Sequence, residues 1–123
     1  MINTSFNSRD SLTNITGFHA HVYYNQESKS QADLLRESLN NTFEERIRLG
    51  RWHDNPIGPH PIGSYQLAFS PEQFGLVVPW LMVHHGQLSI LVHPETGNDL
   101  IDHRNYSLWI GEQLELNLKV FQK

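Results

Sequence analysis

The chain has 123 residues, enough for one domain with one hydrophobic core, and its 38% hydrophobic and 18% charged residues are typical of a soluble globular protein. Nine basic and 13 acidic side chains leave a net charge of −4, which argues against nucleic acid or an anionic membrane as the main partner. There is no cysteine, so disulfides, thiolate metal sites and a cysteine nucleophile are excluded. Eight histidines stand out, because imidazole is the commonest metal ligand and titrates near neutral pH.

Residues 1–16 are rich in Ser, Asn and Thr, and we expect them to form a flexible leader before a single domain over residues 17–123. No apolar run approaches the ~20 residues that are needed to span a bilayer. The N-terminus also lacks the charged and apolar regions of a signal peptide. We therefore expect a cytoplasmic protein.

The first predicted strand covers about residues 17–24, where aromatic and β-branched residues follow a period of two. Even-numbered residues form the face that we expect in the core, while His19, His21 and Tyr23 form the other face. The Cα atoms of same-face neighbours on a strand are roughly 6.5–7 Å apart, so two imidazoles at this spacing can bind one metal ion. The alternative is a solvated strand face with two polar histidines.

A capping box that begins at Ser28 predicts a helix over about residues 29–42, with apolar residues at spacings of three and four. Alternation then predicts a second strand over about residues 44–52, whose basic face is typical of a half-exposed edge strand. The following loop, residues 52–63, contains three prolines and is expected to be stiff. Its His60 is either part of a site or merely exposed.

Three further elements are predicted in order: a strand over residues 64–69, a helix over about 70–85 and a strand over 88–93. His84 and His85 precede Gly86 at the end of this helix, where polar or cationic residues suit the last turn, so we take both as structural. The alternating residues 114–120 predict a fifth strand or a dimer arm.

The order strand, helix, strand, strand, helix, strand predicts an α+β fold of the ferredoxin-like βαββαβ type, with an antiparallel sheet in the order 4-1-3-2 and both helices on one face. We place strand one in the centre, parallel to strand three and antiparallel to strand four. This order brings His93 next to His19 and His21, and it brings the loop with His60 to the same end of the sheet. The helix-free face then needs a cover, which predicts a homodimer.

Histidines from three separate segments thus converge, which predicts a metal or catalytic site. Four of them should surround one centre, with three binding the metal: His19, His21, His60 and His93. The fourth would act as an acid–base group or support a ligand. His53 and His103 are further candidates for catalysis, where they would touch the substrate or the outer nitrogen of a ligand.

Several short motifs between about residues 18 and 111 are specific in combination: His19-Ala20-His21-Val22-Tyr23, Leu49-Gly50-Arg51, Gly58-Pro59-His60-Pro61, Pro79-Trp80-Leu81, Leu88-Ser89-Ile90-Leu91-Val92-His93-Pro94, Thr96-Gly97-Asn98-Asp99, Asp102-His103 and Trp109-Ile110-Gly111. Together they resemble the DOPA 4,5-dioxygenase family of small extradiol dioxygenases. The resemblance implies a ferredoxin-like fold, often dimeric, and a non-haem iron.

Extradiol cleavage, the reaction that the resemblance implies, uses Fe(II) with open coordination positions for a catechol and O₂. Zn²⁺ or another divalent ion can take the place of iron in a crystal. The commonest ligand set for such iron is two His and one carboxylate, for which Glu95, Asp99 and Asp102 are the nearest candidates. An all-His site is the alternative. A further His, such as His19, His53 or His103, would do the acid–base work near neutral pH.

Substrate contacts are expected from Tyr23, Arg51 and Gln66, because a guanidinium pairs well with a substrate carboxylate. For Arg48 we favour a solvated strand edge. Two other functions stay open: a non-catalytic dimeric module that binds a small aromatic ligand, and a hydrolase or lyase that uses Zn²⁺ at the same histidines. Metal analysis separates the module from the enzymes, and oxygen uptake with a catechol separates a dioxygenase from a hydrolase.

Overall fold

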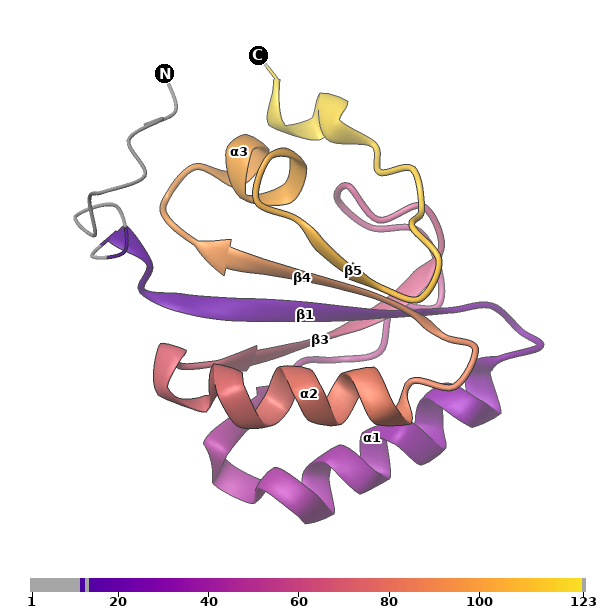
Figure 1. Ribbon diagram of the computed structural model, residues 1–123. Coiled ribbons are helices and arrows are strands. Elements are labelled where there is room, and N and C mark those ends of the chain that lie inside the picture. Colours follow the sequence, from indigo (N-terminus) through magenta and orange to yellow (C-terminus); the bar gives the residue numbers. More distant parts are fainter. Residues whose placement is uncertain (1–11, 13, 123) are drawn as a thin grey trace.

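Five strands form one antiparallel sheet, with helices on both of its faces (Figure 1). The computed structural model describes residues 12 and 14–122, so most of the leader predicted over residues 1–16 lies outside the described residues. The elements in chain order are β1 (Gly17–Tyr24), α1 (Lys29–Phe43), β2 (Ile47–Leu49), β3 (Gly63–Phe69), α2 (Phe74–His84), β4 (Ser89–Glu95), α3 (Asp99–Arg104) and β5 (Leu108–Ile110). Short 3₁₀ turns cover Glu44–Arg46, Pro71–Gln73 and Leu118–Phe121.

The strands lie in the order β2-β3-β1-β4-β5, and every neighbouring pair is antiparallel. The first six main elements follow the predicted βαββαβ sequence. The expected four-stranded order 4-1-3-2 gives way to a five-stranded one, because β5 adds to the edge beside β4. The parallel pairing expected for β1 and β3 is wrong, because these strands are antiparallel. The crossover through α1 gives β2 the same direction as β1, and β3 then runs in the opposite direction to both.

Three local predictions are also wrong. The second strand is much shorter than residues 44–52, since a 3₁₀ turn occupies its first three residues and the ladder ends at Leu49. The fifth strand predicted over residues 114–120 does not form, and a 3₁₀ turn begins at Leu118 instead; the alternative, a dimer arm, stays a prediction. The hydroxyl of Ser28 donates to Asn25 Oδ1 at 3.1 Å and makes no bond to the helix, so the capping box does not form.

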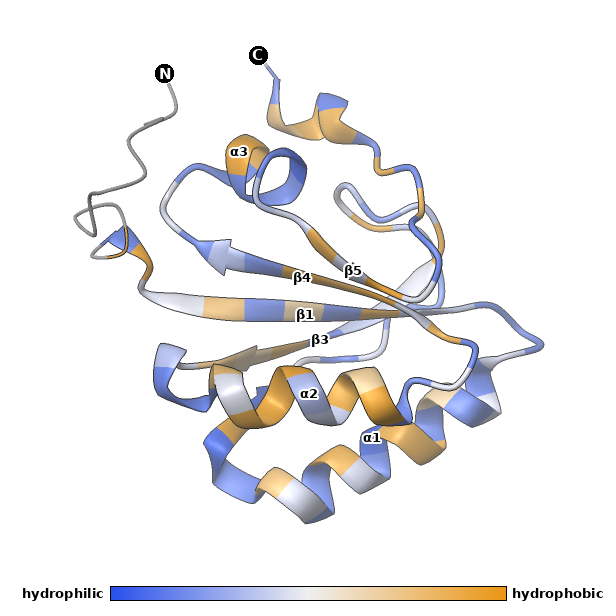
Figure 2. Ribbon diagram, viewed as in Figure 1, coloured by the Kyte–Doolittle hydropathy of each residue, from blue (hydrophilic) through white to orange (hydrophobic). Residues whose placement is uncertain are grey.

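One hydrophobic core lies between the sheet and the helices α1 and α2, where Figure 2 shows apolar residues along both helices and the central strands. Ala20 and Val22 of β1 are fully buried there, as the period of two predicts. They pack with Leu39 of α1 and Leu81 of α2, which are also 0% exposed. Each such leucine contributes about 1.5–3 kcal/mol through burial, so the position of β1 is strongly determined.

The other face of the sheet is covered by the chain itself. Helix α3, the loop after β2 and the C-terminal tail, residues 111–122, lie over it, opposite to α1 and α2 (Figure 1). Leu91, the side chain expected to need a second subunit, is 0% exposed. The reason given for a homodimer therefore does not hold on this face, and the homodimer stays a prediction. In the described part of the chain, no helix has the length and apolar character that crossing a membrane requires.

Candidate metal centre

The odd-numbered residues of β1 point to the face that α3 and the tail cover. His19 lies directly opposite His93 of β4, and His21 lies opposite Gln66 of β3. Side chains of directly opposite residues share a face, so the two central strands present their imidazoles side by side. His21 and His93 are only 5% and 1% exposed, although both are polar. Buried polar side chains of this kind need partners, which are found among the histidines themselves.

Three of these histidines have the spacing of ligands to one ion. Ring nitrogens of His19, His21 and His93 all lie within 4.8 Å of one another. The Nε2 atoms of His21 and His93 are 3.0 Å apart. Two nitrogens that are each about 2.1 Å from one ion, at a right angle, are separated by about 3.0 Å, so this pair fits neighbouring ligand positions. A second group, His21, His60 and His103, meets the same 4.8 Å condition.

His60 reaches this group from the loop between β2 and β3. Gly58 has a φ of 54°, which glycine adopts readily, and it permits a turn in which the His60 N–H donates to Ile57 O at 2.9 Å. The His60 ring lies 4.2 Å from the ring of His21, between centroids. Since β3 is antiparallel to β1, the loop enters beside Tyr23, at the end of β1 and not at its beginning as expected.

Fixed contacts hold this loop in place, as its prolines predict. Asp54 accepts hydrogen bonds from the Tyr24 hydroxyl at 2.7 Å and from Lys29 Nζ at 2.9 Å. At the tip of the loop, the carbonyl of Pro59 accepts from the backbone N–H of Asn117 in the tail at 2.8 Å. The loop is thus fastened to β1, α1 and the tail, and His60 is positioned by all three.

His103 joins the group from α3, a helix that the sequence analysis missed. Its ring lies 4.0 Å from His93 and 4.8 Å from Phe121 of the tail, and its Nδ1 bonds the carbonyl of Asp99 at 2.8 Å. A signal for this helix was present: Asn98 caps its first turn with a side-chain hydrogen bond, acidic residues follow, and basic residues end it. Without the helix, the direction of His103 could not be inferred.

Burial keeps the imidazoles neutral. It lowers the pKa of His93 to about 3 and that of His60 to about 4, because the low-dielectric interior disfavours the charged form and neighbouring histidines add repulsion. The pKa of His21 falls well below its ordinary value for the same reasons. Burial, then the charges of His103 and Arg48, also lowers the pKa of His19. Neutral imidazole is the form that binds a metal.

The three candidate carboxylates do not take ligand positions among these imidazoles. Glu95 Oε1 lies 2.8 Å from His19 Nδ1 and 3.7 Å from His93 Nδ1, so it contacts outer nitrogens. Asp102 is 0% exposed and accepts both from the backbone N–H and from the hydroxyl of Thr96, at 2.9 and 2.5 Å. Asp99 is exposed. Among the imidazoles the donor set is therefore all-histidine, with Glu95 orienting His19 and lying near the outer nitrogen of His93. The three carboxylates form a separate group, whose oxygen atoms lie within 4.8 Å of one another.

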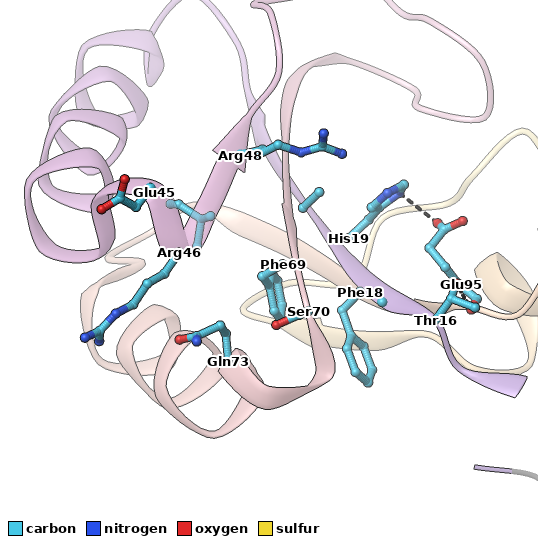
Figure 3. Close-up of a pocket in the computed structure, with 13 residues that line it drawn as sticks. Thr16, Phe18, His19, Glu45, Arg46, Arg48, Phe69, Ser70, Gln73 and Glu95 are labelled. Carbon is cyan, nitrogen blue, oxygen red and sulfur yellow. Dashed lines mark hydrogen bonds and ion pairs between the residues drawn. The ribbon is translucent and has the colours of Figure 1, made fainter. Parts of the chain in front are cut away.

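A cavity of about 510 Å³ opens beside His19 (Figure 3). Arg48 of β2 lies opposite Ala68 of β3, which lies opposite His19, so the three residues form one row across the sheet. Figure 3 shows Arg48, His19 and Glu95 on one side of the sheet and Phe18 on the other. A guanidinium thus faces the same cavity as the outermost imidazole of the group.

Other residues predicted for the site lie further away. Arg51 follows the end of β2, is exposed and does not line this cavity. His53 is half-buried and pairs through its backbone with Ser64, outside both histidine groups. His84 and His85 bond carbonyl oxygens at the end of α2, at 2.8 and 2.9 Å, and they also lie outside both groups.

Comparison with known proteins gives this arrangement a context. The sequence profile of the Dopa 4,5-dioxygenase family matches residues 18–120. An uncharacterized 21.2 kDa protein from Botryotinia fuckeliana is 39% identical over 117 residues, which cover 86% of this chain and 63% of the relative. DOPA 4,5-dioxygenase from Amanita muscaria is 35% identical over 111 residues, which cover 85% of this chain and 49% of the relative. The chain thus spans less than two thirds of either relative.

A solved structure is similar over nearly its whole length. It is the crystal structure of a protein from Nostoc punctiforme PCC 73102, provisionally described as a dioxygenase. The two chains share 52% sequence identity and a TM-score of 0.88, and the match covers 94% of this chain and 97% of the other.

Proposed function

The chain belongs to the Dopa 4,5-dioxygenase family, and on that premise we propose that it is an extradiol dioxygenase, which opens the ring of a catechol with O₂ at a non-haem Fe(II). The family and the provisionally described dioxygenase from Nostoc support a dioxygenase-like function. The observation that carries the proposal is the group of His19, His21 and His93, two of them buried, beside an open cavity.

These three residues fit a divalent metal in number, spacing and protonation state. The outer Nδ1 atoms of His19 and His93 contact oxygen atoms, which leaves Nε2 of each ring for the metal. Bound Fe(II) would supply the redox chemistry and the coordination positions for catechol and O₂. The protein residues hold the neutral imidazoles in place. Helix α3 and the tail cover His21 and His93 and so exclude water from them.

Substrate contacts and acid–base work are proposed for residues on or over the histidine face of the sheet, of which Arg48 lines the cavity. Arg48 would pair with a carboxylate of the substrate, and it replaces Arg51 in this role, because Arg48 lines the cavity beside His19. Gln66, half-buried and opposite His21, would contact the ring that is cleaved. His103, which packs on His93, is the candidate for the acid–base work.

The proposal is tested by loading metal-free protein with Fe(II) under anaerobic conditions and then adding DOPA and air. We expect uptake of one O₂ per catechol and a yellow ring-opened product. His93→Ala should lose bound iron and turnover together with an unchanged circular dichroism spectrum, while His84→Ala should keep both. Iron-loaded protein that consumes no O₂ with any catechol would refute the proposal, and hydrolysis that depends on Zn²⁺ would replace it with the hydrolase alternative.

A further inference from the structure

Two sets of three histidines have the spacing of ligands to one metal ion. The hydrogen-bond partners of their Nδ1 atoms indicate which of these histidines can bind the metal. Three rings direct Nδ1 at an oxygen atom that accepts hydrogen bonds: His19 at the Glu95 carboxylate (2.8 Å), His93 at the Pro94 carbonyl (3.0 Å) and His103 at the Asp99 carbonyl (2.8 Å). In each of these rings Nδ1 must therefore carry the proton. A neutral ring with its proton on Nδ1 has a lone pair on Nε2, which is ready for a metal.

His60 has the opposite kind of partner. Its Nδ1 lies 2.7 Å from the hydroxyl of Tyr23, a side chain that is only 2% exposed. A phenol has an ordinary pKa of about 10, so it carries its proton at neutral pH. Within the described residues, His60 Nδ1 is the one polar partner that the structure gives the hydroxyl. A buried hydroxyl donates where an acceptor exists, so Nδ1 accepts and the neutral ring of His60 carries its proton on Nε2.

We propose that His60 is a hydrogen-bond donor of the site and not one of the metal ligands, and that Tyr23 is the positioning residue that fixes this tautomer. The donating N–H belongs to a ring that packs 4.2 Å from His21, beside the proposed metal position. Trp109 stacks on Tyr23 at 5.8 Å and holds the phenol in place. The identity of the acceptor, an oxygen of the catechol or of O₂, rests on the proposed function.

The tautomer can be read without metal and without turnover. In metal-free protein with ¹⁵N-labelled histidine, long-range ¹H–¹⁵N correlation spectra should show His60 protonated at Nε2 and His93 protonated at Nδ1. Tyr23→Phe removes only the hydroxyl, so it should move His60 toward protonation at Nδ1 and leave His93 unchanged. A wild-type His60 that is protonated at Nδ1 would overturn the inference.

Metal affinity gives a second test. His60→Gln keeps an N–H donor and should bind Fe(II) or Zn²⁺ within about threefold of the wild type, whereas His93→Gln should bind about a hundredfold more weakly. If His60→Gln lost the metal as His93→Gln does, His60 would be a ligand and the inference would be wrong. Neither test needs a reaction, so a failure here is distinct from a failure of the proposed function.

If the proposed function holds, turnover adds a third readout. His60→Ala should lower kcat by about 10²–10⁴ with little change in KM, since a positioned donor acts mainly in the transition state. His60→Gln should recover part of that loss. An unchanged kcat in His60→Ala would show that the N–H takes no part in the reaction.

Discussion

At the scale of single residues, Glu95 acts on the site without occupying a ligand position. Its carboxylate contacts the outer nitrogens of two histidines, at 2.8 and 3.7 Å. Glu95→Gln should therefore weaken metal binding by about 10- to 100-fold, because the rings lose the charge that orients them and raises their basicity. Competition with a chelator measures the change. Glu112→Gln, on an exposed residue of the tail, is the control, and equal affinities for both variants would contradict the role of Glu95.

Substitutions of two arginines near the site should have different effects on the KM for DOPA. Both side chains are exposed, but Arg48 lines the cavity beside His19 and Arg51 lies outside it. Arg48→Met should raise the KM for DOPA at least about tenfold, through loss of a charge-assisted pair with the carboxylate. The KM for 4-methylcatechol, which lacks a carboxylate, should hardly change. Arg51→Met serves as the control; if it were the variant that raised the KM for DOPA, the sequence-based choice of Arg51 would be restored.

Sequence alone predicts the sheet face of a side chain where the residue lies in a regular strand. The period of two along β1 assigns His19, His21 and Tyr23 to one face, and the paired strands keep them there. Arg48 is exposed on the edge strand β2, as its sequence pattern predicts, but that pattern carries no information about the cavity that folding creates beside it. Hydrogen-bond partners such as Glu95 and the Asp99 carbonyl depend on tertiary packing and leave no periodic signal.

At the scale of elements, helix α1 tests the core. Leu39 is 0% exposed beneath the sheet, and Leu34 of the same helix is 65% exposed. Leu39→Ala should lower the free energy of unfolding by about 2–5 kcal/mol, through lost burial and a cavity. Leu34→Ala should change it by less than about 0.5 kcal/mol. Urea denaturation measures both, and similar midpoints would mean that α1 does not pack as described.

Long periodic elements could be predicted, and short ones could not. Strand β1 and helix α1 have enough residues for a period to be visible, whereas α3 has six residues and β5 has three. The directions of strands are harder still, because they depend on how the connections cross the sheet. That is why the convergence of His60 with His21 was expected at the wrong end of β1.

At the scale of the whole molecule, the predicted homodimer would need a surface other than the histidine face. The outer side of α2 offers one, since Leu76, Met82 and Val83 are 54%, 52% and 78% exposed. A helix that is apolar around its circumference is normally buried. If the protein dimerises there, Val83→Glu should give the monomer mass at concentrations where the wild type is a dimer. Light scattering measures both, with Leu34→Glu as the control, and a wild type that stays monomeric would rule the dimer out.

One strand, β1, serves the core with its even-numbered residues and the histidine group with its odd-numbered ones. Tolerance to substitution should therefore alternate along residues 17–24. In a library of all single substitutions, changes at Ala20 or Val22 should reduce the amount of folded protein, and changes at His19 or His21 should abolish turnover at normal abundance. Sequencing after separate selections for abundance and for activity would reveal the two interleaved patterns. Selection for a new reaction could then act on the odd positions while the fold, held by the even ones, stays as it is.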